Sequence, residues 1–96
     1  MIRSFGDAAT EQVFYGEDSR VARRLPKELW TFIRRKLDAL QAAKALTDLR
    51  VPPGNRLEAL KGDLRGRHSI RVNERFRITF RFEDGHAWEV RCEDYH

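Results

Sequence analysis

The C-terminal third of the chain alternates apolar with polar residues, and this period of two restricts the segment to β-strands. The predicted strands cover residues 69–72, 75–82 and 87–92. Asp84-Gly85 is a strong hairpin signal between the last two strands, and Asn73-Glu74 is a weaker one between the first two. We therefore expect an antiparallel meander in which the apolar residues of all three strands share one face.

The middle of the chain has the period of a helix instead. Apolar residues recur at helical spacing at Leu29, Ile33, Leu37 and Leu40. This stripe predicts an amphipathic helix over residues 26–44, with Pro26 at the first position, where its missing N–H costs nothing. Such a helix needs an apolar surface to cover, and the sheet is the only candidate.

Two shorter elements precede this helix. Residues 1–5 predict a first strand, and residues 7–15 predict a short helix with Asp7 as its N-cap and Gly16 at its end. The expected fold is therefore a single α/β (α+β) domain over residues 1–96. In it, two to three helices pack on one face of a mainly antiparallel four-stranded sheet.

Cysteine usage and hydropathy indicate the protein's setting. Cys92 is the only cysteine, so no internal disulfide can form, and the three scattered histidines give no zinc-ligand spacing. We expect no metal and no cofactor. No run reaches the ~18 apolar residues that span a bilayer, and residues 1–5 lack the apolar stretch of a secretory signal. We therefore expect a cytoplasmic protein that makes no membrane contact.

The charge of the chain predicts a polyanionic partner. The net charge is +4, and 15 of the 19 basic residues are arginines, which bind phosphate through two parallel hydrogen bonds and stack on bases. Residues 56–81 contain eight basic and three acidic residues. Such a basic segment is typical of nucleic-acid binders. The alternative is a solvated sheet face that contributes only solubility.

The strand alternation places many of these arginines together. If the apolar residues face the helix, the alternate residues share the opposite, open face. The residues expected there are Arg71, Arg75, Arg77, Arg81, Arg91 and Tyr95. Asp94 and His96 have the other parity, at a strand end where strict alternation often fails. Trp88 and Cys92 are predicted to fill the core, together with Trp30.

The last three residues bring proton-transfer groups next to this basic face. RNA is cleaved when its 2′-OH attacks the adjacent phosphate, and an enzyme assists by moving protons and by stabilising the anionic phosphorane. Arg77 and Lys61 suit phosphate stabilisation, whereas Asp94, Tyr95 and His96 are candidates for proton transfer. The alternative is that each terminal group is solvated and inert, and that Lys61-Gly62-Asp63 is only a turn.

Several motifs together resemble the HigB toxins of the RelE-like superfamily. They are Asn55-Arg56-Leu57-Glu58-Ala59-Leu60-Lys61-Gly62-Asp63, His68-Ser69-Ile70-Arg71-Val72-Asn73, Phe76-Arg77-Ile78-Thr79-Phe80 and the terminal Asp94-Tyr95-His96. The resemblance implies a toxin of a type II toxin–antitoxin system that cuts mRNA in the A site of the 70S ribosome. It implies that Lys61, Arg77, Asp94, Tyr95 and His96 form the catalytic site. Some members have histidine where this chain has Glu58, and tryptophan is frequent where it has Phe76.

The resemblance also implies partners. A cognate helix-turn-helix antitoxin, HigA-like, would bind operator DNA, and the toxin would reach that DNA only through it. The arginines expected to bind RNA and the ribosome are Arg65, Arg67, Arg71, Arg75, Arg81 and Arg91. Two alternatives remain open at this point: a RelE/ParE-type toxin that inhibits without cutting RNA, and a plain nucleic-acid-binding module. Codon preference, antitoxin identity and the oligomeric state of the free toxin also stay open.

Overall fold

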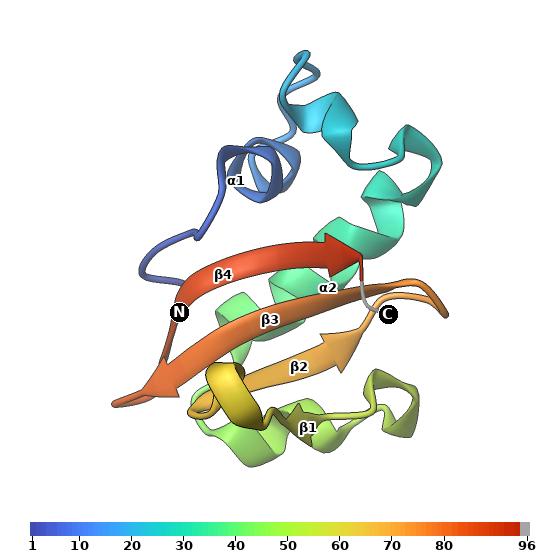
Figure 1. Cartoon of the computed structure of the whole chain (residues 1–96). Coiled ribbons are helices and arrows are strands. Elements are labelled where there is room, and N and C mark those ends of the chain that lie inside the picture. Colours follow the sequence, from blue (N-terminus) through green and yellow to red (C-terminus); the bar gives the residue numbers. More distant parts are fainter. Residues whose placement is uncertain (95–96) are drawn as a thin grey trace.

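A four-stranded antiparallel sheet with two helices forms the structure, a computed structural model that describes residues 1–94. The helices and strands are α1 (Ala8–Phe14), α2 (Trp30–Ala42), β1 (Glu58–Ala59), β2 (Arg67–Arg71), β3 (Phe76–Glu83) and β4 (His86–Asp94). The strands lie in the order β1-β2-β3-β4. Helix α2 lies behind the sheet and α1 lies beside β4 (Figure 1). The predicted fold class is confirmed.

The two helices begin and end as their sequences indicate. The Asp7 carboxylate accepts a hydrogen bond from the backbone N–H of Thr10 at 2.8 Å, and Gly16, with a φ of +77°, follows the end of α1. Pro26 precedes a 3₁₀ turn (Lys27–Leu29) that leads directly into α2. Within residues 1–94, no helix is long and apolar enough to cross a membrane.

The core lies between α2 and the sheet. Ile33, Leu37 and Leu40 of the predicted helical stripe are fully buried. Ile70, Ile78 and Phe80 face them from β2 and β3 and are buried equally well. The shared apolar face therefore forms as predicted, and it leaves the alternate residues of β2 and β3 on the open face.

The predicted first strand over residues 1–5 is wrong as a continuous strand. Two isolated parallel bridges hold this segment to β4, Ile2 with Ala87 and Phe5 with Val90. Between the bridges, the Ser4 hydroxyl accepts a hydrogen bond from the backbone N–H of Glu89 at 2.8 Å. A side chain thus takes the place of a ladder bond, and the fourth strand of the sheet is instead β1 at the opposite edge.

A β-bulge in β4 explains a second difference from the prediction. Thr79 pairs with Arg91 and Arg81 pairs with Trp88, so two residues of β4 oppose one residue of β3. Glu89 in this bulge has a φ of +53°. The bulge reverses the alternation, so Ala87 enters the core fully buried. Trp88 is only half-buried and shares the open face with Arg81, so its predicted place in the core is wrong.

The two predicted hairpin turns are confirmed. Asp84 and Gly85 connect β3 to β4 with φ values of +53° and +77°, as a tight turn with two left-handed residues requires. Between β2 and β3, the Asn73 side-chain oxygen accepts a hydrogen bond from the backbone N–H of Phe76 at 2.7 Å. These turns bring the end of β2, the start of β3 and the end of β4 to the same end of the sheet (Figure 1).

Candidate active site

Arg77 is a buried arginine on the open face of the sheet, with only 7% of its surface exposed. Its Nε donates a hydrogen bond to the Ser69 hydroxyl at 2.9 Å, and its Nη2 donates to the backbone carbonyl of Arg56 at 2.6 Å. Its Nη1 lies 3.8 Å from a carboxylate oxygen of Glu58. Several partners thus fix the guanidinium plane, whereas a surface arginine samples many rotamers.

The strand register explains why these groups meet. Ser69 pairs with Glu58 across β1 and β2, and Arg71 pairs with Arg77 across β2 and β3. Ser69, fully buried and small, therefore leaves room on the open face for the long side chain of Arg77. Arg56 has a φ of +46°, a left-handed conformation that a residue with a β-carbon adopts at a cost.

Lys61 shares a hollow with Glu58, the carboxylate beside this arginine. Glu58 and Lys61 line the same hollow of about 330 Å³, which Leu60 and Leu64 complete. Gly62 has a φ of +66°, a left-handed conformation that glycine adopts without strain. The two predicted phosphate-binding residues therefore flank a carboxylate. Because Glu58 carries a negative charge, it lowers the positive potential beside Arg77.

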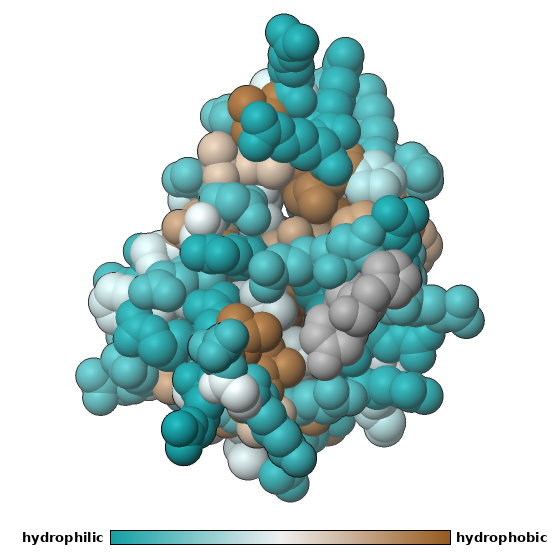
Figure 2. All heavy atoms as spheres, in the orientation of Figure 1, coloured by the Kyte–Doolittle hydropathy of each residue, from teal (hydrophilic) through white to brown (hydrophobic). Residues whose placement is uncertain are grey.

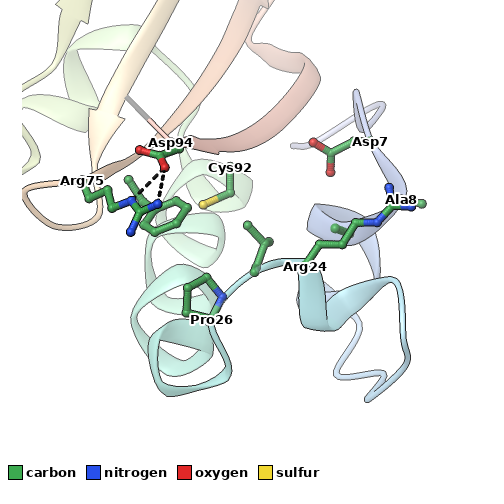
Figure 3. A pocket seen from close by; sticks show the side chains of 10 residues that line it. Asp7, Ala8, Arg24, Pro26, Arg75, Cys92 and Asp94 are labelled. Atoms are coloured by element: carbon green, nitrogen blue, oxygen red, sulfur yellow. Dashed lines mark hydrogen bonds and ion pairs between the residues drawn. The ribbon is translucent and has the colours of Figure 1, made fainter. Parts of the chain in front are cut away.

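Asp94 lies in a different hollow. Its carboxylate lies 2.7 Å from both Nε and Nη2 of Arg75, above a groove of about 420 Å³. Figure 3 shows this pair on one side of the groove, with Arg24 and Pro26 across from it. Asp94 follows the parity of Cys92, as predicted from the alternation. Asp94 and Arg77 are thus near neighbours at the same end of the sheet, but they line different hollows.

The predicted place of Arg75 on the open face is wrong. Arg75 lies in the turn that precedes β3, and the β3 ladder begins only at Phe76. Strand alternation therefore does not fix the direction of its side chain, which instead follows the Asp94 carboxylate into the groove. Its guanidinium also lies 5.5 Å from the centre of the Phe76 ring.

Cys92 lines the groove beneath the Asp94–Arg75 pair and is 5% exposed. Burial raises the pKa of its thiol to about 12, with smaller contributions from the carboxylates of Asp7 and Glu93. The thiol is therefore neutral near pH 7 and is a poor nucleophile. The prediction that Cys92 fills the core is confirmed.

The open face is mostly hydrophilic in Figure 2, with some apolar side chains among the polar ones. Its positive and negative charges are mixed more closely than the sequence suggested. Glu89 forms ion pairs with Arg67 at 3.4 Å and with Arg81 at 3.5 Å. Burial lowers the pKa of Arg67, the more enclosed of the two arginines. Arg65 and Arg91 are exposed. The predicted site residues Tyr95 and His96 lie outside the described residues.

Sequence reasoning missed the groups that position Arg77. Ser69 was visible as a polar residue in the alternating segment, two places before Arg71 and in register with the open face. Its link to Arg77 required the β2–β3 register. The Arg56 carbonyl had no sequence signal, because a backbone group at a left-handed position leaves no trace in the residue pattern.

Comparison with known proteins agrees with this fold and identifies a family. Residues 3–96 match the family model described as the RelE-like toxin of the type II toxin–antitoxin system HigB. Toxin HigB-1 of Vibrio cholerae is 47% identical over 87 residues, which cover 91% of this chain and 90% of that protein. Endoribonuclease HigB of Proteus vulgaris is 34% identical over 100 residues, covering 100% of both chains.

Solved structures share the fold at lower identity. YoeB in a YoeB–YefM complex from Staphylococcus aureus superposes with a TM-score of 0.62 at 18% identity, covering 100% of this chain and 98% of that one. A YoeB/ParE toxin from Agrobacterium tumefaciens gives 0.56 at 15% identity, covering 99% and 100%. These structures show the shared fold, whereas the family match over residues 3–96 and the two HigB relatives establish that the chain belongs to the HigB-like toxins of type II toxin–antitoxin systems.

Proposed function

We propose that this chain is an endoribonuclease that cuts mRNA in the A site of the 70S ribosome. The observation that carries the proposal is the guanidinium of Arg77, which Ser69 and the Arg56 carbonyl hold in place. A cation fixed in this way suits a phosphate that gains charge during a reaction, because the protein need not reorganise at that moment. The activity named for the Proteus vulgaris relative supports the same function.

In the proposed reaction the 2′-OH attacks the adjacent phosphorus, and the bond from phosphorus to the 5′ oxygen breaks. Arg77 and Lys61 stabilise the phosphorane. Asp94, Tyr95 and His96 share three tasks, namely removing the 2′ proton, protonating the departing oxygen and orienting the RNA. Histidine is the side-chain type whose ordinary pKa lies nearest neutrality, so His96 is the natural acid or base of the three. This route requires no metal ion or other cofactor.

The ribosome supplies the remaining contacts in this proposal. The arginines proposed to dock on it are Arg65, Arg67, Arg71, Arg75, Arg81 and Arg91. The family description supports an antitoxin as the protein partner, and we propose a HigA-like helix-turn-helix protein that alone contacts operator DNA. A toxin directed at translating ribosomes acts in the cytoplasm.

Primer extension on mRNA in a purified translation system tests the activity. The intact chain is compared with a chain that ends at Glu93, and with the Tyr95→Phe and His96→Gln variants. We expect discrete cuts that require ribosomes, that disappear in the truncated chain and that decrease sharply in the two variants. Ribosome binding, measured by co-sedimentation, should be nearly unchanged in the variants.

Uncut mRNA in a reaction with folded toxin and active ribosomes would refute the nuclease. The specific observation that favours this outcome is Glu58, whose carboxylate competes with a phosphate for Arg77. The function would then be that of a RelE-scaffold toxin that inhibits without cutting, or of a nucleic-acid-binding module. Unchanged cutting by Tyr95→Phe and His96→Gln would instead keep the nuclease but remove its proposed proton-transfer residues.

A further inference from the structure

A second hollow adjoins Arg77, separate from the one that Lys61 lines. Its volume is about 190 Å³, and the residues that line it include Arg56, Arg71 and Arg77. Asn73 and Glu74 from the β2–β3 turn complete its wall. Three arginines around so small a hollow outnumber its one carboxylate and give it a positive potential that attracts an anion. The proposed chemistry at Arg77 and Lys61 does not explain why Arg56 and Arg71 are there.

The backbone brings these arginines together. Arg71 and Arg77 are direct partners in the β2–β3 register, so their side chains leave the same face side by side. Arg56 arrives from the short 3₁₀ turn Pro53–Asn55, and its left-handed φ of +46° turns its carbonyl toward Arg77. Within residues 1–94, neither Arg56 nor Arg71 forms an ion pair.

We propose that this hollow binds a backbone phosphodiester of the RNA strand, next to the phosphate that is cut. The inference rests on the proposed function, because it takes Arg77 as the point where the scissile phosphate lies. The two hollows meet at the Arg77–Glu58 pair, with Lys61 in one and Arg56 and Arg71 in the other. A strand that crosses Arg77 therefore carries its next phosphate toward Arg56 and Arg71.

An acidic protein segment is the competing occupant, since guanidinium groups also bind carboxylates. Two features favour RNA. The hollow continues the surface that carries Arg77, the residue proposed to hold the phosphate that is cut. A phosphodiester accepts hydrogen bonds from several guanidiniums at once, whereas one carboxylate side chain offers a single planar edge.

Salt-dependent binding of a short single-stranded RNA with 2′-O-methyl groups tests the site without cleavage. Removing one arginine that binds a phosphate should make the slope of log affinity against log salt shallower by about 0.7. We expect this change, with roughly a tenfold decrease in affinity at low salt, for Arg56→Asn and for Arg71→Gln. Asparagine tolerates the left-handed backbone at position 56, so this variant removes the charge but keeps the local fold.

Three further variants separate charge from structure. Arg71→Lys keeps the charge and should keep most of the salt slope. Glu74→Gln removes the carboxylate from the wall and should raise affinity. Arg50→Gln, which removes an exposed arginine outside the hollow, is the matched control and should leave the slope unchanged. Thermal unfolding of each variant confirms that it is folded.

Several results would overturn the inference. A salt slope equal to that of the wild type in both Arg56→Asn and Arg71→Gln excludes a phosphate bound in the hollow. Loss of antitoxin binding by these variants, with unchanged RNA binding, would assign the hollow to a protein. If the wild type cuts mRNA and the two variants keep the wild-type salt slope, only this phosphate site is refuted. If the variants have shallower salt slopes but the wild type does not cut mRNA, the proposed nuclease is refuted and a phosphate-binding site remains.

Discussion

Arg75 and Arg77 lie two residues apart in the chain, yet their surroundings differ in almost every respect. The side chain of Arg77 is 8% exposed and is held on the open face by Ser69 and the Arg56 carbonyl. The side chain of Arg75 is 64% exposed and pairs with Asp94 above the groove beside α1. The same residue type is therefore a fixed part of the sheet in one place and a solvated surface group in the other.

The difference shows that arginines in this chain have two separate tasks. Some hold a guanidinium in a fixed position, and others attract a polyanion from a distance. Burying a guanidinium costs solvation energy that hydrogen bonds must offset, and the sheet supplies them only where its register is continuous. An exposed ion pair is stabilised far less, because water screens it. We therefore expect substitutions at Arg77 to change both stability and catalysis, and substitutions at Arg75 to change little besides long-range attraction.

The largest effect is expected for Arg77→Lys, which keeps the charge but cannot reach Ser69 and the Arg56 carbonyl together. Cleavage in the translation system should decrease by about 10²-fold or more, since a fixed donor to the phosphorane is removed. The free energy of unfolding should decrease by about 1–3 kcal/mol, because buried partners lose hydrogen bonds. Arg75→Lys is the matched control. Equal losses of cleavage and stability in the two variants would show that Arg75 and Arg77 do not differ in role.

Ser69→Ala should have the next largest effect. The buried hydroxyl that accepts from Arg77 Nε is removed, and we expect the free energy of unfolding to decrease by about 1–2 kcal/mol. Cleavage should decrease about tenfold because the guanidinium can tilt, while ribosome affinity stays constant. Thr79→Ala removes another buried hydroxyl of the same face, one that contacts Arg67 and Glu93. Similar cleavage in both variants would mean that Ser69 acts only on stability.

Glu58→Gln tests the charge beside Arg77. The pair is long at 3.8 Å and its carboxylate is half exposed, so we expect stability to change by less than about 1 kcal/mol. Removing the negative charge should raise the affinity for single-stranded RNA roughly threefold at low salt. The control is Glu17→Gln, an exposed glutamate far along the chain. An affinity equal to that of the control would show that Glu58 does not compete with phosphate.

The sequence predicted what depends on local pattern. Asp7 and Gly16 marked the ends of α1, and the alternation of β2 and β3 gave their core face correctly. These predictions succeeded because capping chemistry and strand period are properties of neighbouring residues. The meander and its two turns followed for the same reason, and the family motifs pointed to Lys61 and Arg77.

What failed depended on the three-dimensional register. The bulge at Glu89 moved Trp88 to the open face, although no glycine or proline marked it. Arg75 left the predicted surface because the ladder began one residue later, at Phe76. The pairing of arginines with Glu89 and Glu58 was equally hidden, since it joins residues far apart in the chain. A residue pattern predicts which side chains share a face, but a shift of one residue exchanges the faces.

The smallest effect is expected for the Arg75–Asp94 pair. A double-mutant cycle with Arg75→Gln, Asp94→Asn and the combined variant isolates their coupling, whatever other contacts each residue makes. The two side chains are 64% and 38% exposed, so we expect a coupling of about 0.2–1 kcal/mol that decreases as salt is added. Urea unfolding of the four proteins measures it. A coupling above about 2 kcal/mol that resists salt would place Arg75 with Arg77 among the fixed groups.

Cleavage by Asp94→Asn, measured in parallel, separates this stabilising role from the proposed catalytic one, because Arg75→Gln breaks the same ion pair and leaves the carboxylate in place.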